Sequence, residues 1–473
     1  MRKTKIVCTL GPASSDERVI EAMLRAGMNM ARLNFSHGTH DSHGQLIERF
    51  RRVRDRLGLA AAVMLDTKGP EVRIGQMQPG TVLQQGAEFC LFDDVQRVGD
   101  AAGAGLSCPT LIGAVKVGQK LLIDDGHIEL TVQQVLPDRL VCHVMRGGPL
   151  NSRKGLNAPS VHLPLPFLSE QDRRDLLFGI GQQVDFVAAS FVRDAQDVAD
   201  MRRFLDENGG ERIRIIAKIE SCESIDNFDS ILTEADGIMV ARGDLGVEVN
   251  YERLPGIQKR FIRRCYQSGK MVITATQMLD SMMHSATPTR AEITDVAGAV
   301  FDGTSAVMLS GESAQGQYPV QAVQVMASIA EQAEQDAFAQ NAFANIRHDN
   351  DVTDVTNAIC DAACTTARDI CAKAILAVTQ TGTTARLTSK FRPQQPIVAV
   401  TPDDKTYHQL SLSWGVYPVK AQAQCGTEQL FAHAVECARS IGMVQAGDHV
   451  VITGGMPLGV PGGTNTLKVH TVE

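Results

Sequence analysis

The segment RIIAKIES, residues 214–221, ends an apolar run with Lys218 and Glu220, which are two residues apart. Side chains two apart on a strand point to the same face, so we expect this lysine and this carboxylate to lie side by side. Asp244 follows the next apolar run along the chain. Glu220 and Asp244 are candidate oxygen ligands for Mg²⁺, which typically takes only one or two protein carboxylates. Lys218 beside such a metal would supply positive charge to an anionic substrate, as phosphoryl transfer requires.

Polar residues also follow other apolar runs, which suggests that they gather at one rim of the fold. A single Lys-x-Glu at a strand end is equally consistent with a solvated ion pair, and Arg-Gly-Asp-Leu-Gly alone is consistent with a tight turn. Their joint placement favours a functional site. The further candidates are two cations (Arg32 and Arg73) and four oxygen donors that suit a monovalent cation (Asn34, Ser36, Asp66 and Thr67), together with Thr276, Ser310 and Glu312.

Eight short apolar runs separated by amphipathic, helix-like segments account for these positions. Helix-start signals at residues 14–17 and 169–172 support the helical segments. Eight strand–helix units predict an α/β fold with a (β/α)₈ TIM barrel, whose chemistry lies at the carboxyl ends of the strands. The expected strands are residues 5–10, 28–35, 61–66, 185–192, 214–220, 237–244, 271–278 and 304–311.

The third unit is interrupted by about a hundred residues with short alternating strands and many turn signals. This pattern predicts a small β-barrel domain inserted at the functional rim, where it could act as a lid. A second α/β pattern follows a polar stretch that begins near residue 341. We therefore expect a barrel domain at 1–69 and 167–340, an inserted β lid domain at 70–166 and a C-terminal α/β regulatory domain at 341–473.

Composition limits the class of protein. The 473 residues are 44% hydrophobic and 21% charged, which is typical of a soluble chain with several domains. The net charge of −8 argues against a broad nucleic-acid-binding surface. We find neither a long uncharged apolar stretch nor a signal-peptide pattern, so we expect a cytoplasmic protein with no membrane partner. The eleven cysteines lack zinc-like spacing, and we expect reduced thiols.

With these residues in hand, the chain closely resembles the pyruvate kinase family over essentially its whole length. The resemblance rests on TKIVCTLGPASS, MNMARLNFSHG, MLDTKGPEVR, AKIES, GIMVARGDLGVE, TATQMLDSM and VMLSGESAQGQYP. It implies phosphoryl transfer from phosphoenolpyruvate to ADP, giving pyruvate and ATP in the last step of glycolysis, with Mg²⁺ or Mn²⁺ and usually K⁺. Family members are usually homotetramers, which we expect here by resemblance only. The start of the chain almost at the first strand favours the bacterial type.

The resemblance also implies roles for individual residues. Lys218 would bridge the transferring phosphoryl group, and Arg32 would hold it from the opposite side. Glu220 and Asp244 would bind Mg²⁺, while the backbone around Gly243 and Asp244 and the hydroxyl of Thr276 would bind the substrate carboxylate. The other positions match the family's K⁺ site (Asn34, Ser36, Asp66 and Thr67), its nucleotide site (Asn34, His37, Arg73 and Lys154) and a water-linked route that protonates the enolate (Ser310 and Glu312).

Glu71, in the segment TKGPEVR, bears on the monovalent cation. It resembles the family form in which a carboxylate accompanies K⁺ dependence, whereas members with a lysine there can dispense with the ion. A fixed lysine charge would replace the cation electrostatically, so Glu71 predicts activation by K⁺.

A threonine-rich turn is the candidate effector site, because the family's C-terminal domain often carries an allosteric sugar-phosphate site. As a bare motif the turn is equally an ordinary connection, but its hydroxyls, N–H groups and following helix could bind a phosphate. Residues 454–465 lack the Trp and Arg of eukaryotic members activated by fructose 1,6-bisphosphate, so a monophosphorylated sugar or a nucleotide stays an alternative. The residues of the turn are Thr379, Thr381, Gly382, Thr383 and Thr384.

Two other functions compete with this interpretation. Another Mg²⁺-dependent barrel enzyme acting on phosphoenolpyruvate or pyruvate, such as a mutase or an aldolase, would not need a lid with Arg73 and Lys154 for a nucleotide. A catalytically silent metabolite sensor would bind a sugar phosphate in its C-terminal domain. The intact set of Arg32, Lys218, Glu220, Asp244 and Thr276 argues against the sensor.

Overall fold

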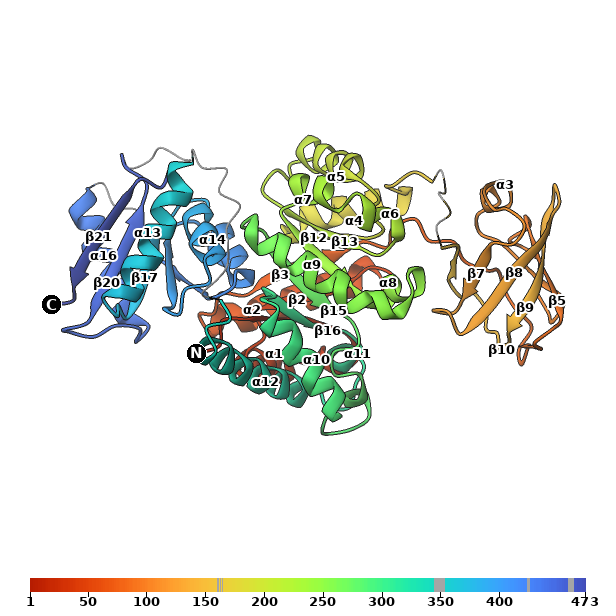
Figure 1. Ribbon diagram of the computed structural model, residues 1–473, viewed down its shortest axis with the longest axis horizontal. Helices are drawn as coiled ribbons and strands as arrows, with labels where there is room; N and C mark the ends of the chain where they lie inside the picture. The colour runs from red at the N-terminus through yellow and green to blue at the C-terminus, as the bar shows by residue number, and fades with distance from the viewer. Residues whose placement is uncertain (160, 162, 164, 344–353, 423–425, 458–462) are drawn as a thin grey trace.

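The structure is a computed structural model that describes residues 1–159, 161, 163, 165–343, 354–422, 426–457 and 463–473. Figure 1 shows an elongated molecule with a β-rich part at one end, a barrel in the middle and an α/β part at the other end. The β-rich part, within residues 70–166, is called the lid below. The α/β part, which follows α12, is called the C-terminal part.

Eight parallel strands close into a barrel in the order β1-β16-β15-β14-β13-β12-β3-β2. The predicted TIM barrel is therefore confirmed. Except for β3, which ends at Asp66 as expected, the observed strands end one to three residues before the ends of the expected runs, because several rim residues belong to the loops and helices that follow. The strands are β1 (Lys5–Thr9), β2 (Met30–Asn34), β3 (Ala62–Asp66), β12 (Phe186–Ala189), β13 (Arg214–Ile219), β14 (Gly237–Ala241), β15 (Met271–Ala275) and β16 (Ala306–Leu309).

Helices surround the barrel, and side-chain caps set where several of them begin. Asp16 caps α1 by accepting from the Arg18 N–H, while residues 12–14 before it form a short 3₁₀ turn. Ser169 forms a reciprocal capping box at the start of α4, as the sequence predicts. The helices are α1 (Glu17–Ala26), α2 (His40–Arg56), α4 (Glu170–Gly181), α5 (Ala195–Glu207), α6 (Cys222–Asp226), α7 (Phe228–Glu234), α8 (Arg242–Glu248), α9 (Leu254–Gln267), α10 (Arg290–Phe301), α11 (Gly311–Ala314) and α12 (Pro319–Ala339).

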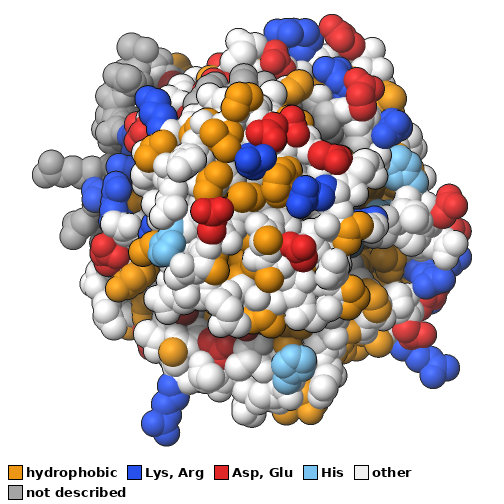
Figure 2. Space-filling view, turned by 90° about the vertical axis from the view of Figure 1, so that its right-hand side faces the viewer, with side chains coloured by type: hydrophobic (Ala, Val, Ile, Leu, Met, Phe, Trp, Pro, Cys, Tyr) orange, Lys and Arg blue, Asp and Glu red, His pale blue; other side chains and the backbone are white. Residues whose placement is uncertain are grey.

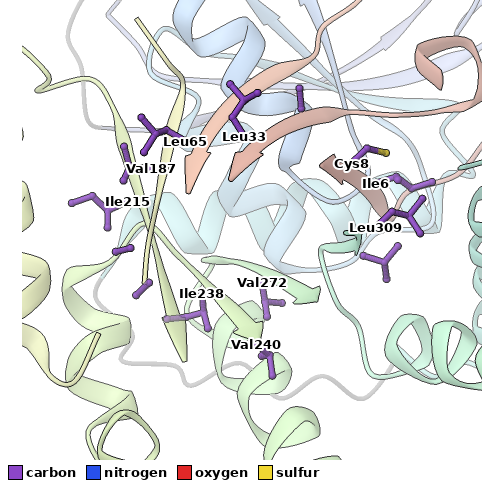
Figure 3. Packing of buried hydrophobic residues seen from close by; sticks show 14 of the residues in the cluster. Ile6, Cys8, Leu33, Leu65, Val187, Ile215, Ile238, Val240, Val272 and Leu309 are labelled. Atoms are coloured by element: carbon purple, nitrogen blue, oxygen red, sulfur yellow. The ribbon is translucent and has the colours of Figure 1, made fainter. Parts of the chain in front are cut away.

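Strand alternation divides the barrel residues into two cores. Ile215 and Ile238 belong to the larger core between strands and helices, and Figure 3 shows such residues around the barrel wall. Ile216 and Met239, one position further along each strand, belong to the separate core inside the barrel. A residue two positions after an interior residue also faces the interior, so the strands carry their final polar side chains into the barrel mouth.

The lid contains a six-stranded mixed sheet in the order β11-β7-β8-β9-β5-β6, and a two-stranded sheet of β10 and β4. Its own core includes Phe89, Leu121 and Leu130, so it packs as a unit separate from the barrel. Figure 2 views the molecule from the lid end, where acidic and basic side chains are interspersed with apolar ones. The elements of the lid are β4 (Val82–Leu83), β5 (Glu88–Phe92), β6 (Gly103–Gly105), α3 (Thr110–Ala114), β7 (Lys120–Ile123), β8 (Ile128–Val135), β9 (Arg139–Arg146), β10 (Gly148–Pro149) and β11 (Leu156–Asn157).

The C-terminal part is a five-stranded sheet in the order β19-β18-β17-β20-β21, in which only the β20–β21 pair is antiparallel. Four of its described helices are α13 to α16, so the predicted α/β fold of this part is confirmed. The elements are α13 (Val355–Asp369), β17 (Ala374–Val378), α14 (Thr383–Lys390), β18 (Ile397–Thr401), α15 (Asp404–Gln409), β19 (Val416–Lys420), α16 (Thr427–Ser440), β20 (His449–Gly454) and β21 (Thr466–Thr471).

The C-terminal part is joined to the amino-terminal end of the barrel. Leu412 packs into the core inside the barrel. The Lys5 side chain, on β1, donates a 2.6 Å hydrogen bond from Nζ to the Val416 carbonyl. The Tyr417 hydroxyl donates to the Arg2 carbonyl at 2.8 Å. The two parts therefore share both apolar and polar contacts at the end of the barrel opposite its mouth.

No helix within the described ranges is both long and apolar enough to cross a membrane. The ten cysteines that the structure describes are all free thiols.

Candidate active site

The interior-facing ends of the barrel strands form a cluster of charged side chains at the mouth. Arg32, Asp66 and Lys218 each lie two positions after an interior core residue, namely Met30, Met64 and Ile216. Asp66 lies at the centre of the cluster: Arg32 Nε is 2.6 Å from its Oδ2, and Lys218 Nζ is 3.2 Å from its Oδ1. The structure thus brings together residues that are 186 positions apart in the sequence (218 − 32 = 186).

Electrostatics keep Asp66 ionised despite its burial. Burial alone would raise the pKa of this carboxyl, but the neighbouring charges of Arg32 and Lys218 outweigh it and lower the pKa. Burial would likewise lower the pKa of Lys218, whereas Asp66 and Glu220 raise it above its ordinary value. Lys218 is consequently a cation at neutral pH, held among carboxylates.

Glu220 lies next to Lys218, as the period-two argument predicts. Its Oε1 is 2.8 Å from Lys218 Nζ, and its Oε2 accepts a 2.7 Å hydrogen bond from the Phe191 N–H. Burial raises the pKa of Glu220 to about 7, Lys218 opposes the rise and Asp244 adds to it. Burial also raises the pKa of Asp244. Glu220 is therefore a buried carboxylate whose charged form is disfavoured by the half-buried Asp244 nearby.

This pair of carboxylates fits a hard divalent cation. Glu220 Oε1 is buried and, although it is ion-paired with Lys218, it makes no hydrogen bond to the residues that the structure describes. In the described part of the chain, no three or more His, Cys, Asp and Glu side chains are arranged to hold a metal ion. A two-carboxylate site agrees with Mg²⁺, which leaves its other positions to water and substrate.

Asp244 lies on a helix and not at the end of a strand, which corrects the expected strand over residues 237–244. Strand β14 ends at Ala241, and α8 starts at Arg242 and carries Asp244 in its first turn. Gly243 is fixed there because its N–H donates a 2.8 Å hydrogen bond to Thr276 Oγ1. The helix starts early because Arg242 bonds to Asp295 and to the Thr276 carbonyl, both at 2.6 Å.

Thr276 has a left-handed backbone, with φ 70°, which is uncommon for a β-branched residue. The Arg242 guanidinium and the Gly243 N–H hold it in this conformation from the neighbouring strand end. The Gly243 backbone and the Thr276 hydroxyl thus form one unit at the mouth. Arg242 was not among the predicted site residues; its strand-end position was the available signal.

Sequence reasoning also missed Ser190 and Phe191. Ser190 Oγ accepts a 2.8 Å hydrogen bond from Lys218 Nζ and donates to the Thr67 carbonyl at 2.6 Å. Phe191 is left-handed, with φ 54°, and its N–H holds Glu220. Ser190 lies two positions after Ala188, an interior core residue, so strand alternation was the signal that could have found it.

A cavity of about 460 Å³ separates the mouth from the lid. His37 and Asp244 of the barrel line it opposite Arg73 and Lys154. Both cations are paired with carboxylates: Arg73 Nη2 is 2.6 Å from Glu71 Oε2, and Lys154 Nζ is 2.7 Å from Asp124 Oδ1. The predicted nucleotide cations therefore face the same cavity as the candidate metal ligand Asp244.

The candidate monovalent-cation residues lie along the ends of β2 and β3. Asn34 Oδ1 accepts a 3.1 Å hydrogen bond from the Ser36 N–H. Asp66 and Thr67 follow on the neighbouring strand, and the Asn34 and Asp66 Cα positions are paired in the sheet. These four residues supply oxygen atoms beside the Arg32 and Lys218 cluster.

Ser310 and Glu312 lie at the end of β16. Glu312 Oε2 accepts from the Ser310 N–H at 2.7 Å, and its Oε1 accepts from the Leu279 N–H at 3.1 Å. Burial raises the pKa of Glu312. Ser310 Oγ is buried without a hydrogen-bond partner among the described residues. Within the described residues neither of them contacts Lys218, so they form a separate polar group at the mouth.

The threonine turn lies far from this cluster, between β17 and α14. Gly382 has φ 82°, and its N–H donates to Thr379 Oγ1 at 2.9 Å. Thr381 and Thr383 share a 3.0 Å hydroxyl contact, and Arg386 donates to the Thr381 carbonyl at 3.0 Å. Arg386, a cation one helical turn after the loop, was also missed. Residues 458–462 of the neighbouring loop lie outside the described ranges.

Comparisons with known proteins agree with this architecture. The chain matches the family model "Pyruvate kinase, barrel domain" over residues 1–323 and the model "Pyruvate kinase, alpha/beta domain" over residues 357–470. It is 47% identical over 474 residues to a pyruvate kinase of Clostridium acetobutylicum and 43% identical over 474 residues to one of Clostridium perfringens, with 100% of both chains covered each time. It is also 47% identical to a pyruvate kinase of Geobacillus stearothermophilus, covering 100% of this chain and 81% of that one.

Proposed function

Because the chain belongs to the pyruvate kinase family and is therefore a phosphotransferase, we propose that its barrel mouth transfers the phosphoryl group of phosphoenolpyruvate to ADP. The observation that carries the proposal is the buried cluster in which Asp66 joins Arg32 to Lys218 and Lys218 contacts Glu220. It combines two fixed cations for an anionic group with carboxylate oxygen for a metal. The products are pyruvate and ATP.

Lys218 and Arg32 bind the transferring phosphoryl group from two sides and stabilise its charge. Asp66 orients both cations, since its Oδ2 contacts Arg32 and its Oδ1 contacts Lys218. Positioning and charge stabilisation are the main contributions that a protein makes to phosphoryl transfer. The Gly243 backbone and the Thr276 hydroxyl orient the substrate carboxylate, because the contact between them fixes both groups.

Glu220 and Asp244 hold Mg²⁺ in this proposal, with Mn²⁺ as the alternative ion. When bound, the ion neutralises negative charge on phosphoryl and carboxylate oxygens. The chain contributes the buried carboxylate of Glu220, one oxygen of which makes no hydrogen bond to the described residues, and the half-buried carboxylate of Asp244. Asn34, Ser36, Asp66 and Thr67 hold K⁺, and Glu71 marks the K⁺-dependent form of the site.

The lid cations bind the phosphates of ADP. Arg73 and Lys154 line the same cavity as Asp244 and His37, which supports this assignment. Asn34 is assigned to the nucleotide as well as to K⁺. Ser310 and Glu312 deliver a proton to the enolate through water; the Ser310 hydroxyl without a protein partner supports this assignment.

An effector regulates the enzyme through the C-terminal part. We assign Thr379, Thr381, Gly382, Thr383 and Thr384 to a phosphate of a sugar phosphate or nucleotide, and Arg386 beside them adds positive charge. The assembly is a homotetramer in the cytoplasm. The chain divides between residues 69 and 70, 166 and 167, and 340 and 341, which separates the catalytic barrel, the lid that closes over the nucleotide and the regulatory C-terminal part.

The test is ADP-dependent pyruvate formation from phosphoenolpyruvate with Mg²⁺, measured with K⁺ and with a bulky organic cation at matched ionic strength. Glucose 6-phosphate, fructose 1,6-bisphosphate, ribose 5-phosphate and AMP are scanned as effectors. We expect activity that K⁺ stimulates and that one effector class increases. Folded protein that binds a sugar phosphate but forms no pyruvate under any condition would instead favour a metabolite sensor.

A further inference from the structure

Ser190 connects Lys218 to Asp66 and Thr67 at the barrel mouth. Its hydroxyl accepts from Lys218 Nζ at 2.8 Å, donates to the Thr67 carbonyl at 2.6 Å and lies 3.2 Å from Asp66 Oδ1. The Ser190 N–H donates to Thr67 Oγ1 at 3.1 Å. Ser190 is 2% exposed, so these contacts form without competing bulk water. A single side chain therefore links β13 to the residue that follows β3.

The contacts of Ser190 limit where the Lys218 ammonium can lie. An ammonium has three N–H donors, and three oxygen atoms lie close to Lys218 Nζ: Ser190 Oγ accepts a hydrogen bond at 2.8 Å, while Glu220 Oε1 at 2.8 Å and Asp66 Oδ1 at 3.2 Å form ion pairs with it. Ser190 is the only uncharged one of these three. Without its hydroxyl, the ammonium would have to rely on the two carboxylates.

The residue after Ser190 positions the carboxylate that pairs with Lys218. The Phe191 N–H donates to Glu220 Oε2 at 2.7 Å from a left-handed backbone with φ 54°. Gly69, with φ 72°, packs against both residues: a Cβ there would lie 2.9 Å from Phe191 Cδ2 and 3.0 Å from Ser190 Cβ. The Ser190–Phe191 turn is thus confined between the start of the lid and the charged cluster.

We propose that Ser190 is a positioning residue that takes one N–H of the Lys218 ammonium, so that the ammonium does not engage Glu220 and Asp66 more closely and these carboxylates stay available to cations. The inference rests on the proposed function, because it takes Glu220 as a metal ligand and Lys218 as the phosphoryl-binding cation. Removal of the hydroxyl releases the N–H donor of Lys218 that Ser190 had accepted, and this donor then turns to the two carboxylates. Competition with the metal follows, and the ammonium moves from its position for the substrate.

The test measures Mn²⁺ binding to the full chain by electron paramagnetic resonance of free Mn²⁺, without substrate, for the wild type and Ser190→Ala. We expect the Mn²⁺ dissociation constant to rise about tenfold, the size of effect seen when a residue that orients a metal ligand is removed. In steady-state assays kcat should fall at least as much, while KM for ADP changes less than twofold, because Arg73 and Lys154 contact neither Ser190 nor Lys218.

Ser305→Ala is the matched control. Ser305 is also 2% exposed, and its hydroxyl accepts from the Val272 N–H at 3.2 Å, at the opposite end of the barrel. Ser190→Cys is the second variant if Ser190→Ala does not fold, since a thiol of similar length is a weak acceptor. Unchanged Mn²⁺ affinity in the Ser190 variant, or an equal loss in Ser305→Ala, would overturn the proposal. Absence of pyruvate formation by the wild type would instead reject the proposed function itself.

Discussion

Lys218 Nζ lies 2.8 Å from Glu220 Oε1, so the proposed phosphoryl-binding cation and the proposed metal ligand are direct neighbours. Each favours the charged form of the other: the carboxylate raises the pKa of the lysine, and the lysine opposes the effect of burial on the pKa of the carboxylate. A buried pair of this kind is worth little as a source of stability. Its position at the barrel mouth is better explained by function.

Replacing Lys218 by methionine should separate the two half-reactions. We expect Lys218→Met to lower the rate of phosphoryl transfer by about a thousandfold, since one charge-stabilising donor at a transition state is worth about 10²–10³ in kcat. Enolisation of added pyruvate, followed by exchange of its methyl protons with solvent deuterium, should fall less. Lys259→Met, which removes an exposed lysine on α9, is the control. Equal losses in both half-reactions would contradict the role assigned to Lys218.

Neutralising a proposed metal ligand should weaken metal binding directly. Glu220→Gln removes a charge from the pair with Asp244 and should raise the Mn²⁺ dissociation constant at least about tenfold, an expected loss of about 1.4 kcal/mol. Equilibrium titration of Mn²⁺ without substrate measures it. Glu223→Gln changes a carboxylate that lines the same cavity and should bind Mn²⁺ like the wild type. If both variants lose affinity for Mn²⁺ to the same extent, the overall negative charge of the cavity, and not Glu220 itself, determines metal binding.

The barrel mouth could be predicted because its main residues follow strand alternation. Arg32, Asp66 and Lys218 each lie two positions after an apolar residue of the barrel interior. Asp244 was expected on a strand because nothing in GIMVARGD shows that Arg242 bonds to the neighbouring strand end. That contact depends on the closed barrel, so local sequence could not specify it.

Other features depend on tertiary structure in the same way. The left-handed conformations of Phe191 and Thr276 contradict the local preference of these residues. They are stabilised by Glu220 and Gly243, which come from neighbouring strand ends. The pairing of Arg73 with Glu71 and of Lys154 with Asp124 was also not predicted. The Lys154–Asp124 pair depends on β11 and β7 being neighbours, which local sequence does not specify, whereas Arg73 and Glu71 are only two residues apart.

A charge reversal at Glu71 should alter the need for K⁺. Glu71→Lys would add a fixed positive charge near Asp244, whose pKa Glu71 raises in the wild type, and should allow turnover without K⁺. Glu71→Gln removes the pairing with Arg73 without adding a cation, so it should stay dependent on K⁺. Turnover is compared in KCl and in a bulky organic cation at matched ionic strength. Continued K⁺ dependence of Glu71→Lys would contradict the electrostatic substitution.

Removal of a lid cation should weaken nucleotide binding more than chemistry. Lys154→Met leaves Asp124 without its 2.7 Å partner and removes a positive charge from the cavity. We expect KM for ADP to rise about tenfold, which corresponds to about 1.4 kcal/mol, while KM for phosphoenolpyruvate changes little. Lys116→Met, at an exposed position of the lid, is the control. A larger change in kcat than in KM for ADP would place Lys154 closer to the reacting groups.

Lys5 is buried where the barrel meets the C-terminal part. Burial lowers the pKa of Lys5 to about 7; the nearby charges of Arg2 and Lys3 add to this, and Glu334 opposes it. The lysine in the unfolded chain keeps a pKa near 10.5. Between these values the unfolded state binds more protons than the folded state, so stability rises with pH from about 7 toward 10, by as much as about 1.4 kcal/mol per pH unit.

Lys5→Met should remove this dependence. The melting temperature of the wild type, measured by calorimetry in matched buffers, should therefore rise relative to that of Lys5→Met between pH 7 and 9. Below pH 7 the offset between the two should be constant, because Lys5 is charged in both states. Lys373→Met, an exposed lysine of the C-terminal part, should follow the wild type at every pH. Melting-temperature curves for the wild type and Lys5→Met that stay parallel from pH 6 to 9 would show that Lys5 remains charged in the folded protein. Its buried ammonium would then be stabilised by the 2.6 Å hydrogen bond to the Val416 carbonyl and by the Tyr417 ring, whose centroid is 4.7 Å away.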